Sequence, residues 1–421
     1  MIPITNPRAR SKTNAVLFLI RAYNDLDHIA PIIWKYVKRS NSKIYFVFVG
    51  ASFDQDYRIR AIIAAGARKL EANSIDRYYS NLRPLLGFRL IQKLVDSLVS
   101  NLCGGLFLRK NHIGCVVTEW SGPDGKEKAP FFLKGARLNG IPTIAVPHGY
   151  HTWFNNDFNT VTTECLRITG KLPQLDNRNK FSTYVIQSEN IKRYCIESGI
   201  DANKLVVLGS ARFCKEWSRI NYCLCRSETK FNAPKNKKVV VFFLNHWSYN
   251  VDRNRCIRLL VTIAEEDNVC LVIKGHTRGK STGGLNESEE KLITSYDSVV
   301  IADDDIHSPT LISVADMVIV YGSSICFEAL SQNVLVCRPL FLCSNRTIFD
   351  NSGMVHEVSG EEDVIRLIRN VDCLQSRLED KELKRFLGEH VDNYFQHGGV
   401  LEAHVNLISN TLQSFTNSLP K

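Results

Sequence analysis

Hydrophobic and polar positions follow a repeating order along most of this chain. Short runs rich in Val, Ile and Leu are followed by longer stretches in which apolar residues recur every three or four positions. The first kind of segment is typical of buried strands and the second of amphipathic helices, so their alternation predicts parallel βαβ units. The series occurs twice. We therefore expect two open α/β sheets facing each other, with a ligand cleft between the carboxyl ends of their strands.

The first series covers residues 1–213, and we expect it to form an N-terminal domain. Asp25 and Ser188 have the residue types that cap helix N-termini, so we expect helices to begin after them. The expected helices include 26–39, 55–65 and 189–198, and the expected strands are 15–20, 44–49, 113–119, 143–146, 184–187 and 205–208.

Residues 214–238 are polar, basic and without a clear period, which predicts a linker. A second βα series follows over 239–380, and residues 381–421 are expected to be C-terminal helices. The second series is expected to have strands at 239–244, 269–274, 298–301, 317–320 and 334–337, and helices at 254–266, 287–296, 310–314, 324–331 and 361–372.

Length and composition agree with two domains. A chain of 421 residues exceeds one ordinary hydrophobic core. The 53 basic and 43 acidic residues give a net charge of +10, which favours anionic partners such as sugar nucleotides, lipid headgroups or nucleic acid, or is simply a basic solvated surface. The 13 scattered cysteines predict free thiols in a reducing compartment. Without a signal-peptide core or a 20-residue apolar run, we expect a cytoplasmic protein.

The strongest motif follows the expected strand 317–320. Gly322, Ser323 and Ser324 come directly before a helix, where small residues let backbone N–H groups and hydroxyls meet a phosphate. Glu328 lies one turn further along and can accept hydrogen bonds from ribose hydroxyls. The alternative is a capped helix whose glutamate is only solvated.

A second cluster lies at the end of the expected strand 269–274. Lys274, His276 and Arg278 are spaced two residues apart, as suits the diphosphate of a leaving nucleotide. The alternative is an exposed basic turn. His246, which follows the first strand of the second series, is a weaker candidate for the donor phosphates.

A third cluster lies in the first series. His148 follows a strand that stops at Pro147, so its imidazole can enter the cleft and deprotonate an acceptor hydroxyl. Glu119, at the end of the expected strand 113–119, is a second candidate for the base or for a group that orients His148. His151 and Trp153 are candidates for binding the acceptor sugar.

These motifs, in this order, resemble a branch of the glycosyltransferase B (GT-B) superfamily that makes bacterial capsules and wall polymers. The His-Gly pair at 148, the Lys-x-His-x-Arg run and the Ser-Ser-x-x-x-Glu-Ala run are similar to those of CDP-glycerol glycerophosphotransferases and capsule-type Kdo transferases. The resemblance spans about residues 113–340. It implies two Rossmann-like domains, with His148 as the base, His276 on the donor phosphate, and Ser323, Ser324 and Glu328 on phosphate and ribose.

The sequence differs from the glycerophosphotransferase pattern beside both histidines. Pro147 and Tyr150 flank the His-Gly pair, where that family usually has Trp and Thr, and Thr277 replaces its proline after His276. These differences favour transfer of a sugar over a polyol phosphate. We therefore expect an inverting transferase that uses a CMP, CDP or UDP donor and a glycan or lipid-linked acceptor. No metal or cofactor is expected, since basic side chains and helix dipoles can neutralise the leaving phosphate.

Two other functions stay open. A nucleotide-sugar 2-epimerase shares the two-domain fold and needs no acceptor. A basic nucleic-acid-binding protein is the non-enzymatic alternative, although no RNP, KH or zinc-finger motif is present and we expect no nucleic acid partner. The amphipathic segment 85–110 is either a helix that docks on a membrane surface or a buried helix of the first domain. The buried helix is favoured because amphipathic helices most often face a core.

Overall fold

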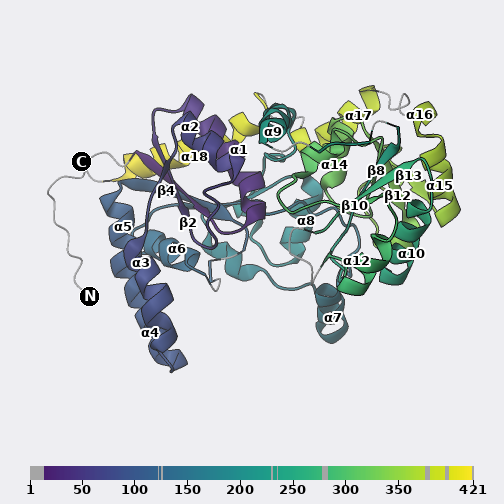
Figure 1. The fold of residues 1–421 in the computed structure, drawn as a ribbon. Helices are drawn as coiled ribbons and strands as arrows, with labels where there is room; N and C mark the ends of the chain where they lie inside the picture. Colours follow the sequence, from purple (N-terminus) through teal and green to yellow (C-terminus); the bar gives the residue numbers. More distant parts are fainter. Residues whose placement is uncertain are drawn as a thin grey trace. The chain divides into compact units, whose positions relative to one another are not determined.

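Parallel strands and covering helices form two separate units. The computed structural model describes residues 14–121, 123–124, 127–228, 231–234, 236–276, 283–374, 380–393 and 398–419. Unit 1 comprises Met1–His148, Leu175–Arg212 and Asn393–Lys421, and unit 2 comprises Gly149–Gln174 and Phe213–Asp392. Each unit has its own parallel sheet with helices on both faces (Figure 1).

The sheet of unit 1 has seven strands in the order β3-β2-β1-β4-β5-β6-β7, all paired in parallel. The central strands are buried on both faces, which explains why most of their residues are apolar. Its strands are β1 (Ala15–Ile20), β2 (Lys43–Phe48), β3 (Arg68–Lys69), β4 (Ile113–Glu119), β5 (Thr143–Val146), β6 (Thr183–Ile186) and β7 (Leu205–Val207).

Helices cover both faces of this sheet. In Figure 1, α1, α2 and α18 lie on one side, and α5 and α6 lie on the other. The helices of unit 1 are α1 (Tyr23–Arg39), α2 (Tyr57–Ala65), α3 (Asn73–Arg77), α4 (Arg89–Val99), α5 (Gly105–Lys110), α6 (Ala129–Leu138), α8 (Glu189–Glu197) and α18 (Val400–Ser418).

The sheet of unit 2 has six parallel strands in the order β10-β9-β8-β11-β12-β13. Alternate residues of its central strand enter different cores: Val240 and Phe242 pack on one face, and Val239 and Val241 on the other. Its strands are β8 (Lys238–Phe243), β9 (Val269–Lys274), β10 (Val299–Ile301), β11 (Met317–Ile319), β12 (Leu335–Pro339) and β13 (His356–Val358).

The helices of unit 2 supply the rest of both cores. Residues of α10 and α15 contribute to the core that contains Val240, and residues of α13 and α14 to the core that contains Val239. The helices are α7 (Thr160–Thr169), α9 (Lys215–Glu228), α10 (Arg253–Ala264), α12 (Glu287–Ile293), α13 (Ser308–Ile312), α14 (Ile325–Ser331), α15 (Glu361–Arg369), α16 (Val371–Leu374) and α17 (Asp380–Leu387).

The predicted α/β class and its strands are confirmed, with ends shifted by no more than two residues. The sequence pattern missed two edge strands, β3 and β13, because their residues are mostly polar: β3 is Arg68 and Lys69, and β13 begins with His356 and Glu357. The edge strands β7 and β10 are equally short but consist of apolar residues, which the pattern detects.

The prediction of an irregular linker at 214–238 is wrong for much of the segment, because α9 occupies Lys215–Glu228. The buried face of α9 consists of Trp217, Asn221 and Cys225. These residues have the four-residue spacing of a helix, but one of them is polar, so hydrophobicity did not reveal the period. The predicted C-terminal helices are present and are divided between units, with α17 in unit 2 and α18 in unit 1.

Residues 149–174, which we expected within the first domain, pack in unit 2. The Tyr150 hydroxyl donates to the backbone carbonyl of His390 at 2.7 Å, and its ring centroid lies 4.8 Å from that of Phe327. The buried Asn345 side chain donates to the carbonyl of Phe158 at 2.7 Å. Aromatic and amide contacts with residues far along the chain therefore hold this segment in unit 2. Such contacts cannot be predicted from a local sequence pattern.

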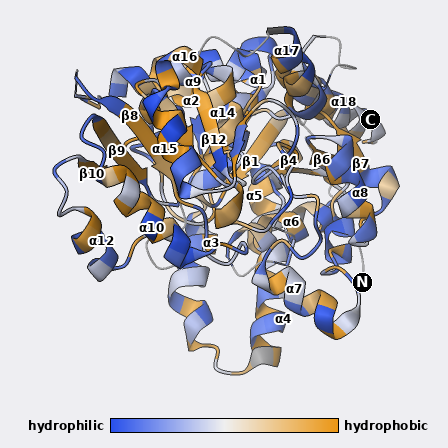
Figure 2. Ribbon diagram, turned by 90° about the vertical axis from the view of Figure 1, so that its right-hand side faces the viewer, coloured by the Kyte–Doolittle hydropathy of each residue, from blue (hydrophilic) through white to orange (hydrophobic). Residues whose placement is uncertain are grey.

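The expectation that segment 85–110 forms a buried helix is wrong for α4. None of the side chains that the structure describes in α4 is buried, and several of its leucines are more than half exposed. Figure 2 shows α4 extending from unit 1 with hydrophobic and hydrophilic residues along its length. Among the described helices, none combines the length and apolar character needed to cross a bilayer. All thirteen cysteines are free thiols, as predicted.

Candidate functional site

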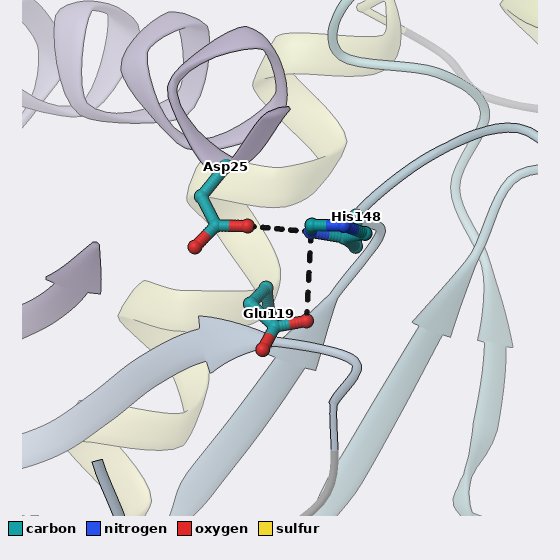
Figure 3. Close-up of side chains that lie close together, drawn as sticks. All are labelled: Asp25, Glu119 and His148. Atoms are coloured by element: carbon teal, nitrogen blue, oxygen red, sulfur yellow. Dashed lines mark hydrogen bonds and ion pairs between the residues drawn. The ribbon is translucent and has the colours of Figure 1, made fainter. Parts of the chain in front are cut away.

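Three polar side chains meet at the carboxyl edge of the unit 1 sheet (Figure 3). Glu119 ends β4, His148 follows β5 by two residues, and Asp25 lies in the first turn of α1, just after β1. Because β1, β4 and β5 are neighbouring parallel strands, their carboxyl ends lie together. The fold therefore brings together three residues, of which Asp25 and His148 are 123 positions apart in the sequence.

Asp25 is fully buried, and its carboxylate is held in place by the backbone. One oxygen, Oδ2, accepts hydrogen bonds from the N–H groups of Arg21 (2.8 Å) and Ala22 (2.9 Å), while Oδ1 lies 2.6 Å from Nδ1 of His148. The sequence predicted Asp25 as the residue before a helix. Instead α1 begins at Tyr23, three residues before the expected start, and Asp25 is its third residue. Sequence reasoning therefore missed the residue that contacts the predicted base.

The contact with Asp25 fixes the tautomer of His148. A carboxylate can only accept hydrogen bonds, so Nδ1 of His148 carries the proton that it donates to Asp25. In the neutral ring, Nε2 then has a free electron pair. The His148 side chain is 23% exposed while that of Asp25 is 0% exposed, so the imidazole is the accessible member of the pair. This arrangement can accept a proton from a bound hydroxyl.

Glu119 lies on the other side of the imidazole and is bound by different donors. Its Oε1 accepts from Arg21 Nε at 3.0 Å, its Oε2 accepts from the backbone N–H of Ser121 at 2.6 Å, and Oε2 lies 3.7 Å from Nδ1 of His148. Burial, and secondarily the nearby Asp25 carboxylate, raise the pKa of Glu119. The interpretation of Glu119 as a group near His148 is thus supported by its position, while its role stays a prediction.

The raised pKa of Glu119 predicts a pH dependence of stability. A carboxyl whose pKa is raised by folding binds more protons in the folded state, so the free energy of unfolding falls as the pH rises above the ordinary pKa of glutamate. Urea unfolding between pH 4 and 8 should show this slope, and Glu119→Gln should reduce it. The exposed Glu197→Gln is the control. An unchanged slope in Glu119→Gln would contradict the assignment.

The same three residues could hold a metal ion, because one ligand atom from each lies within 4.8 Å of the others. Two carboxylates and an imidazole suit a divalent transition metal. Both carboxylates, however, already accept hydrogen bonds from the protein. Hydrogen bonds within the protein therefore hold both carboxylates beside the imidazole of His148. That the reaction needs no metal stays a prediction.

In unit 2, the loop of the predicted phosphate motif lies against Trp153. Gly322 has a φ of +95°, and a Cβ at this position would lie 2.2 Å from Cη2 of the Trp153 ring. The Gly322 carbonyl accepts a 3.3 Å hydrogen bond from the Thr152 hydroxyl. Only glycine suits both the backbone conformation and the close approach of the indole.

Replacing Gly322 with alanine should therefore lower the free energy of unfolding by about 2–5 kcal/mol, from backbone strain and from the clash with Trp153. Gly353→Ala is a matched control: its φ is +74°, but a Cβ there has no heavy atom within 4 Å, so only about 1–2 kcal/mol is expected. Chemical denaturation measures both. Equal losses in the two variants would show that Trp153 does not restrict this loop.

The structure also brings together the histidines of the second predicted cluster. His246 follows β8 and His276 follows β9, and their ring centroids lie 5.8 Å apart in an edge-on arrangement. Asn245 donates through Nδ2 to the carbonyl of Tyr321 at 2.7 Å, which joins the end of β8 to the loop that carries Gly322. The predicted donor motifs of β8, β9 and β11 thus occupy one edge of the sheet.

Other residues that the sequence predicted to bind the donor are partly or fully buried. Lys274 is only 7% exposed, and its Nζ donates to the carbonyl of Asp303. Burial lowers the pKa of Lys274, so part of its expected role is structural. Ser323 and Ser324 are half-buried before α14, and Glu328, on that helix, has one buried carboxylate oxygen. Arg278 lies outside the described residues.

The two predicted acceptor residues, His151 and Trp153, lie in unit 2 and not in the unit of His148. The Trp153 ring stacks on Tyr249, with centroids 5.6 Å apart, and His151 meets Phe158 edge-on at 4.9 Å. Burial lowers the pKa of His151 to about 4, so this imidazole is neutral at physiological pH. Their role with an acceptor stays a prediction, but their packing associates them with the donor motif.

Comparison with known proteins identifies the fold. No family model matches the sequence, and no curated protein matches it either. Several solved structures are similar over nearly the whole chain. A UDP-GlcNAc 2-epimerase from Neisseria meningitidis, bound to UDP-GlcNAc, is 14% identical with a TM-score of 0.55, over 95% of this chain and all of that one.

Two further solved structures are similar to this chain to the same degree. The UDP-GlcNAc 2-epimerase from Methanocaldococcus jannaschii is 13% identical with a TM-score of 0.56, over 94% of this chain and 99% of the other. A glycosyltransferase from Rickettsia africae is 14% identical with a TM-score of 0.55, over 96% and 99%. Likeness at this identity establishes the fold alone. The two Rossmann-like units are those of the GT-B fold, as the sequence predicted.

Proposed function

We propose that this protein is a glycosyltransferase that moves a sugar from a nucleotide-activated donor to a hydroxyl group of a glycan acceptor. The observation that carries the proposal is the 2.6 Å contact between Asp25 and Nδ1 of His148 at the carboxyl edge of a parallel sheet. A buried carboxylate that orients an accessible imidazole is an arrangement suited to general base catalysis.

In the proposed reaction, Nε2 of His148 takes the proton of the acceptor hydroxyl. The acceptor oxygen then forms a bond to the anomeric carbon as the bond from that carbon to the donor phosphate breaks, and the nucleotide leaves with the electron pair. Direct displacement inverts the configuration of the anomeric carbon. Asp25 stabilises the imidazolium that forms and keeps the ring in its productive orientation.

The nucleotide would bind at the carboxyl edge of the unit 2 sheet. His246 and His276 lie together there, and the Gly322 loop with Ser323 and Ser324 connects to the same edge through Asn245. Histidines and hydroxyls are suitable donors to phosphate oxygens. Glu328 is the proposed ribose contact. The sequence predicted a CMP, CDP or UDP donor, and UDP is the first of these to test because similar folds include proteins solved with UDP-GlcNAc.

A nucleotide-sugar 2-epimerase is the second candidate, and a specific observation favours it. Several of the solved structures with this fold are UDP-GlcNAc 2-epimerases, which this chain resembles as well as it resembles glycosyltransferases. An imidazole base with Glu119 beside it could also exchange a proton at a sugar carbon. The two candidates differ in whether an acceptor is needed.

A thermal-shift panel with CMP, CDP, UDP, GDP and ADP tests the shared part of both candidates. A nucleotide that binds only the folded state raises the melting temperature, so stabilisation by one of them identifies the donor class. The nucleotide sugar of that class is then incubated with the protein alone. Epimerised or free sugar would indicate the epimerase, and a requirement for added glycan the transferase. No stabilisation by any nucleotide would contradict both.

A further inference from the structure

A projecting helical hairpin in unit 1 has no part in the proposed reaction. We define the arm as residues 78–106. It consists of a π-helical turn (Tyr78–Leu82), a 3-10 turn (Arg83–Leu85), α4, a second π-helical turn (Ser100–Gly104) and the start of α5. Figures 1 and 2 show α4 extending away from the sheet of unit 1.

The base of the arm is packed closely on α6. A Cβ on Gly104 would lie 2.4 Å from the carbonyl oxygen of Phe131, and a Cβ on Gly135 would lie 2.8 Å from the backbone nitrogen of Gly105. The ring of Tyr78 meets that of Phe131 edge-on at 5.7 Å. These close approaches attach the base of the arm to the body of the unit.

Large apolar side chains of the arm are exposed from its tip to its base. Five leucines recur every fourth residue along α4 and into α5, and a phenylalanine and two leucines precede them at the tip. The exposed fractions are 77% for Leu90, 71% for Leu94, 57% for Leu98, 49% for Leu102 and 53% for Leu106, with 75% for Phe88, 78% for Leu85 and 58% for Leu82. An apolar surface of this extent on one element marks an interaction site.

Internal contacts hold the two sides of the hairpin together and neutralise its acidic residue. Asp96 accepts a 2.7 Å hydrogen bond from the Tyr78 hydroxyl and a 3.1 Å hydrogen bond from Nε of Arg83. The arm is therefore formed before it meets a partner. Its apolar surface does not depend on a folding step that a partner would have to induce.

The charge of the arm and its base identifies the kind of partner. Within the arm, Asp96 is the single acidic residue, against the basic residues Arg83, Arg89 and Lys93, and Arg109 and Lys110 follow shortly after its end. Lys93 is exposed in α4, between Leu90 and Leu94 in the sequence, and Arg109 and Lys110 are exposed near the base. A second copy of this chain would bring like charges together, and nucleic acid has no apolar layer for the leucines. A bilayer with anionic headgroups offers both.

We propose that the arm docks unit 1 on an anionic lipid surface, with Leu85, Phe88, Leu90 and Leu94 entering the boundary between headgroups and acyl chains and Lys93 meeting lipid phosphates. The inference does not depend on the reaction that the enzyme catalyses. It assigns to this chain a peripheral contact with one face of a membrane and no crossing of it.

The test is sedimentation of the full-length protein with vesicles. Wild-type protein should bind vesicles of equal parts phosphatidylglycerol and phosphatidylcholine, and binding to pure phosphatidylcholine should be weaker. Leu90→Gln with Leu94→Gln should lower the partition coefficient at least about tenfold, because two buried leucines are lost. Lys93→Glu with Lys110→Glu should lower it on anionic vesicles, and added salt should have the same direction of effect.

Matched controls alter the same residue types elsewhere. Leu138→Gln with Leu292→Gln removes two leucines that are 55% and 50% exposed, and Arg193→Glu with Lys291→Glu reverses two exposed charges. Both controls should bind as the wild type does. The proposal fails if wild-type protein does not bind anionic vesicles, or if the arm variants bind as well as the controls. It also fails if sedimentation velocity without lipid shows a dimer that the leucine variant abolishes.

Discussion

Replacing His148 with alanine is expected to lower turnover of the nucleotide sugar by about a thousandfold or more, while nucleotide affinity changes by less than about twofold. The imidazole is the accessible member of the Asp25–His148 pair, and its loss removes the group that accepts the proton. The nucleotide contacts are proposed in unit 2, so binding should survive. Rate measurements at saturating donor, combined with calorimetric titration of the nucleotide, separate the two quantities.

His356→Ala serves as the control, because His356 is a partly exposed histidine in the edge strand β13. It should retain the turnover of the wild type. An equal loss of nucleotide affinity and turnover in His148→Ala would contradict the role of a base and would indicate that His148 binds the donor. Unchanged turnover would remove His148 from the reaction altogether.

Asp25→Asn is expected to lower turnover by about a hundredfold to ten-thousandfold with little change in fold. The two backbone N–H groups of Arg21 and Ala22 require an acceptor, so the asparagine carbonyl oxygen should face them and its NH₂ group should face His148. Nδ1 would then have to accept, and the proton would move to Nε2. The imidazole would remain in place in the tautomer that cannot act as a base.

The matched control is Asp27→Asn, two residues further along α1. Asp27 pairs with Arg58 and with Arg212 at 2.9 Å, so its neutralisation should lower stability without changing the His148 tautomer. Nitrogen NMR of labelled histidine reports the tautomer of His148 directly. If Asp25→Asn and Asp27→Asn lose turnover equally, or if the tautomer of His148 is the same in Asp25→Asn as in the wild type, then Asp25 does not act by orienting the base.

Local sequence was enough to locate the elements and the strand ends. The largely apolar runs of β1, β4 and β9 have the same bounds in the structure as in the sequence pattern, because a strand buried on both faces is rich in apolar residues. The positions of Glu119 and His148 followed from this. Parallel strands place the residues that follow them at one edge, so a polar residue after a buried run is a visible signal.

The partners of these residues could not be found in the same way. Asp25 has the residue type and position of a helix cap, and its contact with His148 crosses 123 positions of the chain. That contact depends on β1 and β5 lying on either side of β4, an order that the sequence does not state. Only the strand order therefore shows that the Asp25 side chain contacts the proposed base.

Contacts between distant residues also explain the two predictions about packing that were wrong, for α4 and for residues 149–174. The period of α4 was visible in the sequence, but a helical period is the same whether the apolar face meets a core or solvent, and only the packed structure exposes its leucines. Residues 149–174 look like a continuation of the first series, yet Trp153 fills the space beside Gly322 in unit 2. Periodicity is a local property and fixes the elements. Which surfaces they bury depends on contacts between distant residues, and these exist only once the chain has folded.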